Sequence, residues 1–336
     1  MSPAITRRTF AISLAPALAL ALALALAMCF TPSVFAQDAS AYPSQPLRII
    51  VPYPAGGATD TLARMVASKL QESWRQTVVV ENKPGASGTM GNDLVAKAPR
   101  DGHTVLMAIT ALVQVQSLMP KLPYDALKDL QPLVQVASTN SLLVVPPSTP
   151  ASTLNEFIAL VKAHPGKYNY GSYGIGTSSH IQGSLLNLQA GLDLTHVPYK
   201  GAAPLLQDLR GGQLSAALVD MATVRPHLEF VKVLAATGPQ RNKALPNVPT
   251  FAELGFQSFE PVGWFGLFMP AGVPAPIAAK FIAEASRILR LPDVVARIES
   301  LGMTPGELKG DEFARVVKSD AAVYARIIKD ANIRME

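Results

Sequence analysis

The sequence predicts a two-lobed α/β protein, because short apolar runs alternate with amphipathic stretches in two separate series. In the first series, apolar runs at residues 47–51, 78–80 and 104–108 are separated by helix-like stretches at 61–72 and 91–98. This alternation of strand and helix is typical of a parallel sheet with crossover helices. The length of 336 residues also exceeds the size at which a single core commonly divides into two domains.

The second series begins near residue 142. Its predicted strands lie at 142–145, 169–171, 216–219 and 233–237, and its predicted helices at 152–163, 179–189 and 202–211. Thr153 and Glu156 have the spacing of a capping box at the start of the first of these helices. The second series therefore predicts another α/β unit.

The last part of the chain is predicted to return to the first unit. It consists of an apolar run at 264–270 followed by helical stretches at 276–291, 293–301 and 312–331. Such a return needs two chain crossings, near Val145 and near Glu260, and places a ligand cleft between the lobes. The predicted domains are a signal peptide (1–36), a first lobe (37–145 plus 260–336) and a second lobe (146–259).

The N-terminal stretch has the layout of an export signal. Arg7 and Arg8 precede a long uncharged segment rich in Ala and Leu, and Val34 and Ala36 supply small residues before Gln37. We expect cleavage before Gln37 and a periplasmic location; a retained membrane anchor is the alternative. The sequence leaves open whether export follows the Sec or the twin-arginine route, and whether Cys29 is lipidated.

Composition excludes several function classes. The only cysteine, Cys29, lies in the predicted leader, so the mature chain has no disulfide and no thiol nucleophile. Removing the two leader arginines lowers the formal net charge from +5 to +3, and no run of basic residues could track a nucleic acid. The five histidines are scattered and no dinucleotide fingerprint occurs, so no metal and no cofactor are expected.

Three glycine-rich loops, at residues 52–60, 82–89 and 170–180, each lie between a predicted strand and a predicted helix. Ligands of α/β proteins bind at such strand ends, where glycine permits close backbone approach and the helix start favours an anion. Asp60 would repel an anion there, so we favour a role in capping the helix. His180 at a helix start is expected to stay neutral and hydrogen-bonded.

A series of motifs in a fixed order resembles the Bug-type receptors, the extracytoplasmic solute-binding proteins of tripartite tricarboxylate transporters. The resemblance covers essentially the whole mature chain, and among its best matches are VPYPAGGATD (51–60), VVENKPGASGTMG (79–91), YGSYGIGTSSH (170–180) and WFGLFMPAGVP (264–274). It implies a type II periplasmic-binding-protein fold with hinge strands and an interdomain cleft. It also implies that backbone groups and ordered water hold a ligand carboxylate.

The predicted binding residues combine the positions that match these motifs with the ends of two further strands. They are Tyr53, Gly56, Gly57, Asp60, Ala86, Ser87, Thr110, Tyr173, Gly174, Gly176, Thr177, Ser178, His180 and Asp220. The chain departs from the family at Val115-Gln116, where Asn-Pro is frequent, and at Tyr324, where tryptophan is frequent. The first departure falls at the expected cleft wall, where specificity is set.

The predicted function is that of a monomeric, non-catalytic periplasmic receptor. It captures a small organic acid (a mono-, di- or tricarboxylate, including an aromatic one) for membrane permease subunits, but the sequence does not identify which acid. One alternative is an exported serine hydrolase using Ser87 or Ser172 with His180, although no Gly-x-Ser-x-Gly frame occurs. Another is a sensor module that presents its ligand to a signalling protein.

Overall fold

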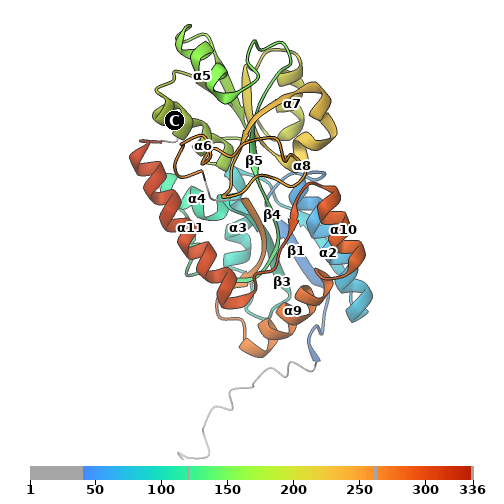
Figure 1. Cartoon of the computed structure of the whole chain (residues 1–336). Helices are drawn as coiled ribbons and strands as arrows, with labels where there is room; N and C mark the ends of the chain where they lie inside the picture. The colour runs from blue at the N-terminus through green and yellow to red at the C-terminus, as the bar shows by residue number, and fades with distance from the viewer. Residues whose placement is uncertain (1–40, 120, 260–262, 334–336) are drawn as a thin grey trace, which may run out of the picture. The chain divides into compact units, whose positions relative to one another are not determined.

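Two β-sheets organise the part of the chain that the computed structural model describes, residues 41–119, 121–259 and 263–333 (Figure 1). These residues belong to one unit, Ala39–Glu336. The predicted signal peptide and its cleavage site lie outside the described residues. None of the described helices is long and apolar enough to cross a membrane.

The first sheet has six strands in the order β11-β4-β10-β3-β1-β2. They are β1 Leu47–Val51, β2 Val78–Asn82, β3 Thr104–Ile109, β4 Leu130–Thr139, β10 Gly263–Pro270 and β11 Thr304–Pro305. Strand β1 pairs in parallel with β2 and β3, as the sequence predicts, whereas β10 runs antiparallel between β3 and β4. The returning segment is therefore part of this sheet.

Helices cover both faces of the first sheet (Figure 1). They are α2 Ala58–Trp74, α9 Ala275–Ile288 and α10 Pro292–Ser300 on one face, and α3 Thr89–Ala96, α4 Ala111–Leu118 and α11 Gly310–Asp330 on the other. Because successive side chains of a strand point to opposite faces, Ile49 packs with α2 and Ile50 with α3, and both are fully buried. Double coverage explains why these strands read as continuous apolar runs.

The second sheet has five strands in the order β7-β6-β8-β5-β9. They are β5 Ser141–Val145, β6 Asn169–Ser172, β7 Thr195–Pro198, β8 Ala216–Asp220 and β9 Lys232–Ala236. Its helices are α5 Leu154–Lys162, α6 Ser178–Ala190, α7 Ala202–Arg210, α8 Met221–Val224 and the 3₁₀ helix η3 Arg225–Phe230. The predicted capping box is present, because Thr153 Oγ1 accepts from Glu156 N–H and Glu156 accepts from Thr153 N–H.

The chain passes from the first sheet to the second at Asn140. Strand β4 ends at Thr139 and β5 begins at Ser141, which pairs with the second sheet. The Asn140 side chain donates to Thr237 O (2.6 Å), so the crossing is tied to the strand that leaves the second sheet. Sheet pairing thus favours a lobe boundary at Asn140, five residues before the boundary predicted at Val145. We keep the limits of the two lobes as a proposal. The return crossing, predicted near Glu260, falls outside the described residues.

Helix α11 contributes to the cores of both lobes. Phe313 and Val317 pack in the first lobe, whereas Tyr324, Ile327 and Ile328 pack with α5 and α6 of the second. A single helix therefore links the two lobes in addition to the strands.

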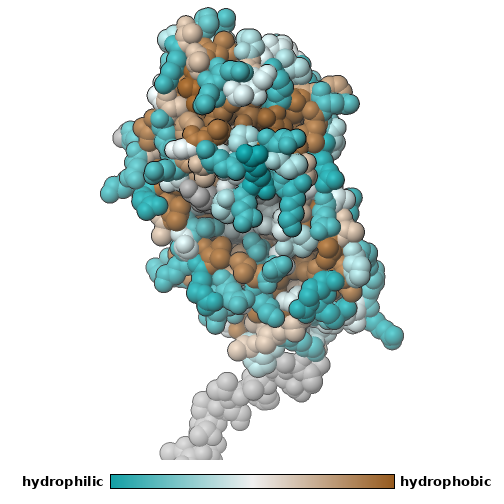
Figure 2. Space-filling view, in the orientation of Figure 1, coloured by the Kyte–Doolittle hydropathy of each residue, from teal (hydrophilic) through white to brown (hydrophobic). Residues whose placement is uncertain are grey.

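The surface around these cores is mixed in character. Figure 2 shows hydrophilic side chains over most of the face drawn, with apolar side chains gathered in patches.

Candidate functional site

The first loop is shaped by Asp60, which is buried with 4 % of its surface exposed. Its Oδ2 accepts from Gly56 N–H and Arg64 Nε (both 3.0 Å), and its Oδ1 accepts from Asn82 Nδ2 (3.0 Å). Asn82 Nδ2 also donates to Tyr53 O (3.1 Å). Asp60 therefore fixes the loop from the first turn of α2. It does not cap the helix as the sequence predicts, because the N-cap is Gly57 and has no side-chain cap hydrogen bond.

Hydrogen bonding keeps the Asp60 carboxyl ionised. Burial raises its pKa, but the hydrogen bonds from Arg64, Gly56 and Asn82 outweigh this effect and hold the pKa below its ordinary value. The negative charge of Asp60 is balanced by the Arg64 guanidinium, whose Nη2 lies 3.0 Å from Asp60 Oδ1. Because the Gly56 amide is used by Asp60, it is not free to bind an anion.

The second loop contains two consecutive residues in the left-handed region. Ala86 has φ 46° and Ser87 has φ 55°, which is uncommon for residues other than glycine. Such conformations cost about 1–3 kcal/mol each and gather at binding sites. A Cβ placed on Gly88 lies 2.9 Å from Tyr53 Oη, so only glycine lets the second loop pack against the first.

The third loop satisfies most of its own amides. Gly174 N–H donates to Ser172 Oγ (3.1 Å), Tyr173 N–H donates to Ser179 Oγ (3.1 Å), and Gly176 N–H donates to His180 Nδ1 (3.2 Å). Gly174 and Gly176 have φ values of 126° and 81°, which only glycine adopts readily. These glycines therefore act by allowing a sharp turn.

His180 stacks on His196, with ring centroids 4.1 Å apart and planes within 15°. Tyr170 also stacks on His196, with ring centroids 4.9 Å apart. Burial lowers the pKa of His180 to about 4, and burial together with the neighbouring His180 lowers the pKa of His196 to about 4. Both rings are neutral at pH 7, as the sequence predicts for His180.

Tyr173 and Asp220 contact each other at the edge of the second sheet. The Tyr173 hydroxyl donates to Asp220 Oδ2 (2.8 Å), and Asp220 Oδ1 accepts from Thr223 N–H (2.9 Å) as the N-cap of α8. Thr110 is used in a similar way in the first lobe, since its Oγ1 accepts from Trp264 N–H (2.8 Å) at the start of β10. The structure therefore gives these three predicted residues partners within the protein.

Two hydrogen bonds join the lobes beside the predicted loops, and a third, from Arg225 Nη1 to Glu299 O (2.7 Å), joins η3 to α10. The Ser87 hydroxyl donates to Ile175 O (2.9 Å), and Gln114 Nε2 donates to Ser178 Oγ (2.8 Å). Apolar contact accompanies them, because a Cβ on Gly176 lies 3.2 Å from Leu118 Cδ1. The three predicted loops are thus contiguous: the first packs on the second, and the second bonds to the third.

The helix starts beside these loops retain free capacity for an anion. The N-cap residues of α2 and α6, Gly57 and Thr177, make no side-chain cap hydrogen bond. The first-turn N–H groups of a helix have no intrahelical acceptor, and they carry the positive end of the helix dipole. Such ends bind carboxylates and phosphates. The N–H groups of the residues that follow Gly57 and Thr177 are therefore the donors best placed for a ligand carboxylate.

The structure contains a serine–histidine contact, but it does not involve His180, the histidine that the hydrolase alternative requires. Ser172 Oγ lies 2.7 Å from His196 Nε2, whereas His180 Nδ1 accepts from Gly176 N–H. Ser172 is fully buried at the end of β6. A histidine with a pKa of about 4 is a weak base at pH 7, and a nucleophile must reach its substrate.

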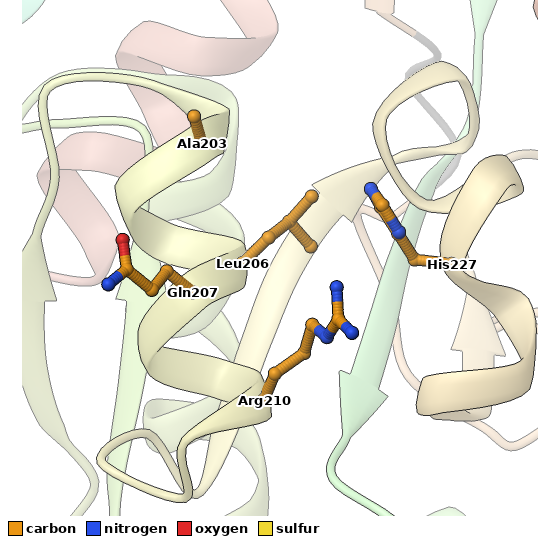
Figure 3. Close-up of a pocket in the computed structure, with 5 residues that line it drawn as sticks. All are labelled: Ala203, Leu206, Gln207, Arg210 and His227. Atoms are coloured by element: carbon orange, nitrogen blue, oxygen red, sulfur yellow. The ribbon is translucent and has the colours of Figure 1, made fainter.

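Metal binding has no support in the described part of the chain, which brings together no group of three or more His, Cys, Asp or Glu residues suited to a metal ion. A cavity of about 320 Å³ in the second lobe lies apart from the loops. It is lined by Ala203, Leu206, Gln207 and Arg210 of α7 and by His227 of η3 (Figure 3). None of the predicted binding residues lines it.

Sequence reasoning missed four residues that organise the site: Asn82, Gln114, Ile175 and His196. Asn82 is the last residue of β2, so the rule that ligands bind at strand ends could have found it. Gln114 lies on α4, a short apolar helix whose N-cap Thr110 makes no side-chain cap hydrogen bond, and it makes its bond through tertiary packing alone. At the noted family departure, Val115 faces the third loop (3.5 Å to the Cβ position of Gly176), whereas Gln116 Nε2 donates to Asp125 Oδ1 (3.0 Å) within the first lobe. Of the two residues, Val115 is therefore the one that contacts the loops.

Comparison with known proteins identifies the family. Residues 62–333 match the family described as tripartite tricarboxylate transporter family receptor. The chain belongs to this receptor family. Its relatives include a protein of the tcbD-tcbE intergenic region of Pseudomonas sp. (strain P51), 37 % identical over 89 % of this chain and 90 % of the relative. BugT of Bordetella pertussis is 33 % identical over 89 % of this chain and 93 % of the relative.

Solved structures agree with this assignment. MatC of Rhodopseudomonas palustris with bound malate has a TM-score of 0.78 and 32 % identity, covering 85 % of the receptor and all of that chain. Rpa4515 of R. palustris with adipate has a TM-score of 0.81 and 29 % identity, covering 87 % of the receptor and 99 % of that chain. The predicted Bug-type family, the two-lobed periplasmic-binding-protein fold and the role as a solute-binding receptor are confirmed.

Proposed function

We propose that this receptor captures a small organic dicarboxylate between its two lobes and passes it, unchanged, to permease subunits of a tripartite tricarboxylate transporter. The observation that carries this proposal is the pair of uncapped helix starts, α2 and α6, within loops that direct hydrogen bonds join across the lobes. The dicarboxylate class is favoured because two structural neighbours are described with adipate and malate.

The proposed binding residues divide into two groups. Gly57, Thr177 and Ser178 mark the helix starts whose N–H groups hold the carboxylates, whereas Gly56, Asp60, Gly174, Gly176 and His180 shape the loops through their internal hydrogen bonds. Hydrogen bonds to a charged group contribute roughly 1.5–3 kcal/mol each, and micromolar affinity needs about 8 kcal/mol. Four or five such bonds are therefore sufficient without any catalytic side chain.

The site of action that we propose is the periplasm. Solved relatives are described as a periplasmic transporter and as the periplasmic binding protein BugD. We further propose that the leader is cleaved before Gln37 and that the mature receptor acts as a monomer without enzymatic activity. These points extend the family assignment with the charge pattern of residues 1–36.

A thermal-shift screen of the mature protein tests the function. We expect dicarboxylates to raise the melting temperature in proportion to the logarithm of their concentration once it exceeds Kd, because a ligand that binds only the folded state stabilises it. Monocarboxylates, tricarboxylates and aromatic acids serve as comparison ligands. Chromatography of each acid after incubation tests for turnover. A receptor that no acid stabilises, or one that converts an acid, contradicts the proposal.

A further inference from the structure

Three helices meet at a polar cluster between the lobes, formed by the buried Gln114 of α4 and Tyr324 of α11 and the half-buried Ser178 of α6. Gln114 is fully buried and its Nε2 donates to Ser178 Oγ (2.8 Å). Tyr324 is 2 % exposed, and burial raises the pKa of its phenol while hydrogen bonds with Gln114 and Ser178 partly offset the rise. The cluster thus connects helices of both lobes through side chains alone.

The cluster includes the first residue of α6, the helix whose N-terminal N–H groups we propose bind the ligand. Ser178 is the first residue of α6, directly after the uncapped Thr177. On the same face of α4, Val115 and Leu118 lie 3.5 and 3.2 Å from the Cβ position of Gly176, in the loop that leads into α6. Helix α4 therefore contacts this helix start from the first lobe, beside Tyr324 of α11.

The Gln114 carboxamide has one hydrogen-bond acceptor that is not used. Its Oε1 is buried and accepts no hydrogen bond from the described residues. A buried amide left half-satisfied is unfavourable for stability compared with an apolar side chain of the same size. The cost is understandable if the residue serves to fix the position of Ser178 and not only to fill the core.

We propose that Gln114, supported by Tyr324, is a positioning residue for ligand binding: it holds the first turn of α6 against the first lobe without touching the ligand. This inference rests on the proposed function. Binding requires the loops of both lobes to be in place, and apparent affinity falls in proportion to the fraction of molecules in that arrangement. Loss of one hydrogen bond between the lobes is expected to weaken binding by roughly three- to tenfold.

The chain offers a matched control on the same helix. Gln116 also donates through Nε2, to Asp125 Oδ1 (3.0 Å), and its Oε1 is also without a partner in the described part of the chain. Its bond stays within the first lobe, nine residues along the chain, whereas the Gln114 bond spans 64 residues and joins the lobes. Gln114→Met and Gln116→Met remove the same chemical group and keep nearly the same volume.

Two measurements on the mature protein test the inference. The first is amide hydrogen exchange of the first turn of α6 without ligand, which we expect to be faster in Gln114→Met and Tyr324→Phe and unchanged in Gln116→Met. The second is stopped-flow fluorescence with malate and with adipate. We expect ligand dissociation about three to ten times faster in the first two variants and wild-type rates in the third.

The outcomes separate the two proposals. Unchanged exchange in Gln114→Met and Tyr324→Phe, or equal effects in all three variants, overturns the positioning role while leaving the receptor function intact. Wild-type protein that binds neither these acids nor any acid of the thermal-shift screen overturns both proposals. If Gln114→Met does not fold, Tyr324→Phe decides the question, because the ring and its packing are kept and only the hydroxyl is lost.

Discussion

Ser87 donates its hydroxyl to the carbonyl oxygen of Ile175, 88 residues further along the chain, at 2.9 Å. This bond joins the second loop in the first lobe to the third loop in the second lobe. Ser87 holds a left-handed backbone conformation (φ 55°), so the loop carries strain at the point where it reaches the other lobe. Ser87 therefore has two effects that mutation can separate: its hydroxyl joins the lobes, and its backbone conformation destabilises the loop.

Replacing Ser87 by alanine and by glycine separates these effects. Both changes remove the bond between the lobes, so we expect both to weaken acid binding by about 0.5–1.5 kcal/mol in calorimetry. Glycine relieves the backbone strain, so Ser87→Gly should be more stable than Ser87→Ala by about 1 kcal/mol in urea unfolding. Wild-type affinity in both variants would show that the bond plays no part in binding.

Two glycines in the loops should respond differently to the addition of a methyl group. Gly176 has φ 81° and its Cβ position lies 3.2 Å from Leu118, so Gly176→Ala is expected to cost about 1–2 kcal/mol of unfolding free energy. Gly57 has φ −78° and its Cβ position is 3.8 Å from Pro54 O, an ordinary contact. We expect Gly57→Ala to change stability by less than about 0.5 kcal/mol. Urea denaturation compares the two, and equal losses would contradict the assignment of strain.

The sequence predicted most of the fold, because its strands and helices carry strong local signals. The parallel set β1, β2 and β3 and the main strands of the second sheet lie where apolar runs occur. Strands β4, β7 and the two-residue β11 were missed. Gln131, Pro132 and Gln135 interrupt the apolar pattern of β4, which depends on pairing with β10, and β7 has four residues that are partly exposed. Tertiary pairing decides such segments, and a single sequence does not reveal it.

The candidate site was predicted in its loops but not in its hydrogen bonds. The glycine-rich segments and their strand ends could be located, whereas the use of the Gly56 amide by Asp60 and of the Gly176 amide by His180 could not. The stacking of His180 on His196 joins residues from α6 and β7, which no spacing along the chain indicates. The site residues remain predictions that ligand-binding measurements must test.

Asp60→Asn should destabilise the receptor more at pH 7 than at pH 3. The folded-state pKa of Asp60 lies below its unfolded value of 3.8, so the ionised carboxylate adds stability above about pH 4, and this contribution is lost as the pH falls through the folded pKa. We expect a loss of roughly 1–3 kcal/mol at pH 7, because the bonds to a charged acceptor become bonds to a neutral one. Urea unfolding at both pH values measures it. Asp125→Asn, at a half-buried carboxyl whose pKa is also lowered, provides a comparison away from the loops. A pH-independent loss would contradict this account.

Asp320→Asn should have the opposite dependence on pH. Burial raises the pKa of the Asp320 carboxyl to about 6, although the hydrogen bond from Trp264 Nε1 (2.8 Å) favours the charged form. The folded protein therefore binds this proton more tightly than the unfolded chain, and its stability decreases as the pH rises from about 4 to about 6. Asparagine keeps an acceptor for Trp264 and removes the charge, so the variant should lose this slope and gain about 1–3 kcal/mol over wild type at pH 7. Because Asp320 accepts directly from Trp264 Nε1, the same titration should also be visible in the Trp264 fluorescence of the wild type and absent from the variant. Identical pH profiles of unfolding free energy for the two proteins would mean that Asp320 is already ionised in the folded state well below pH 6.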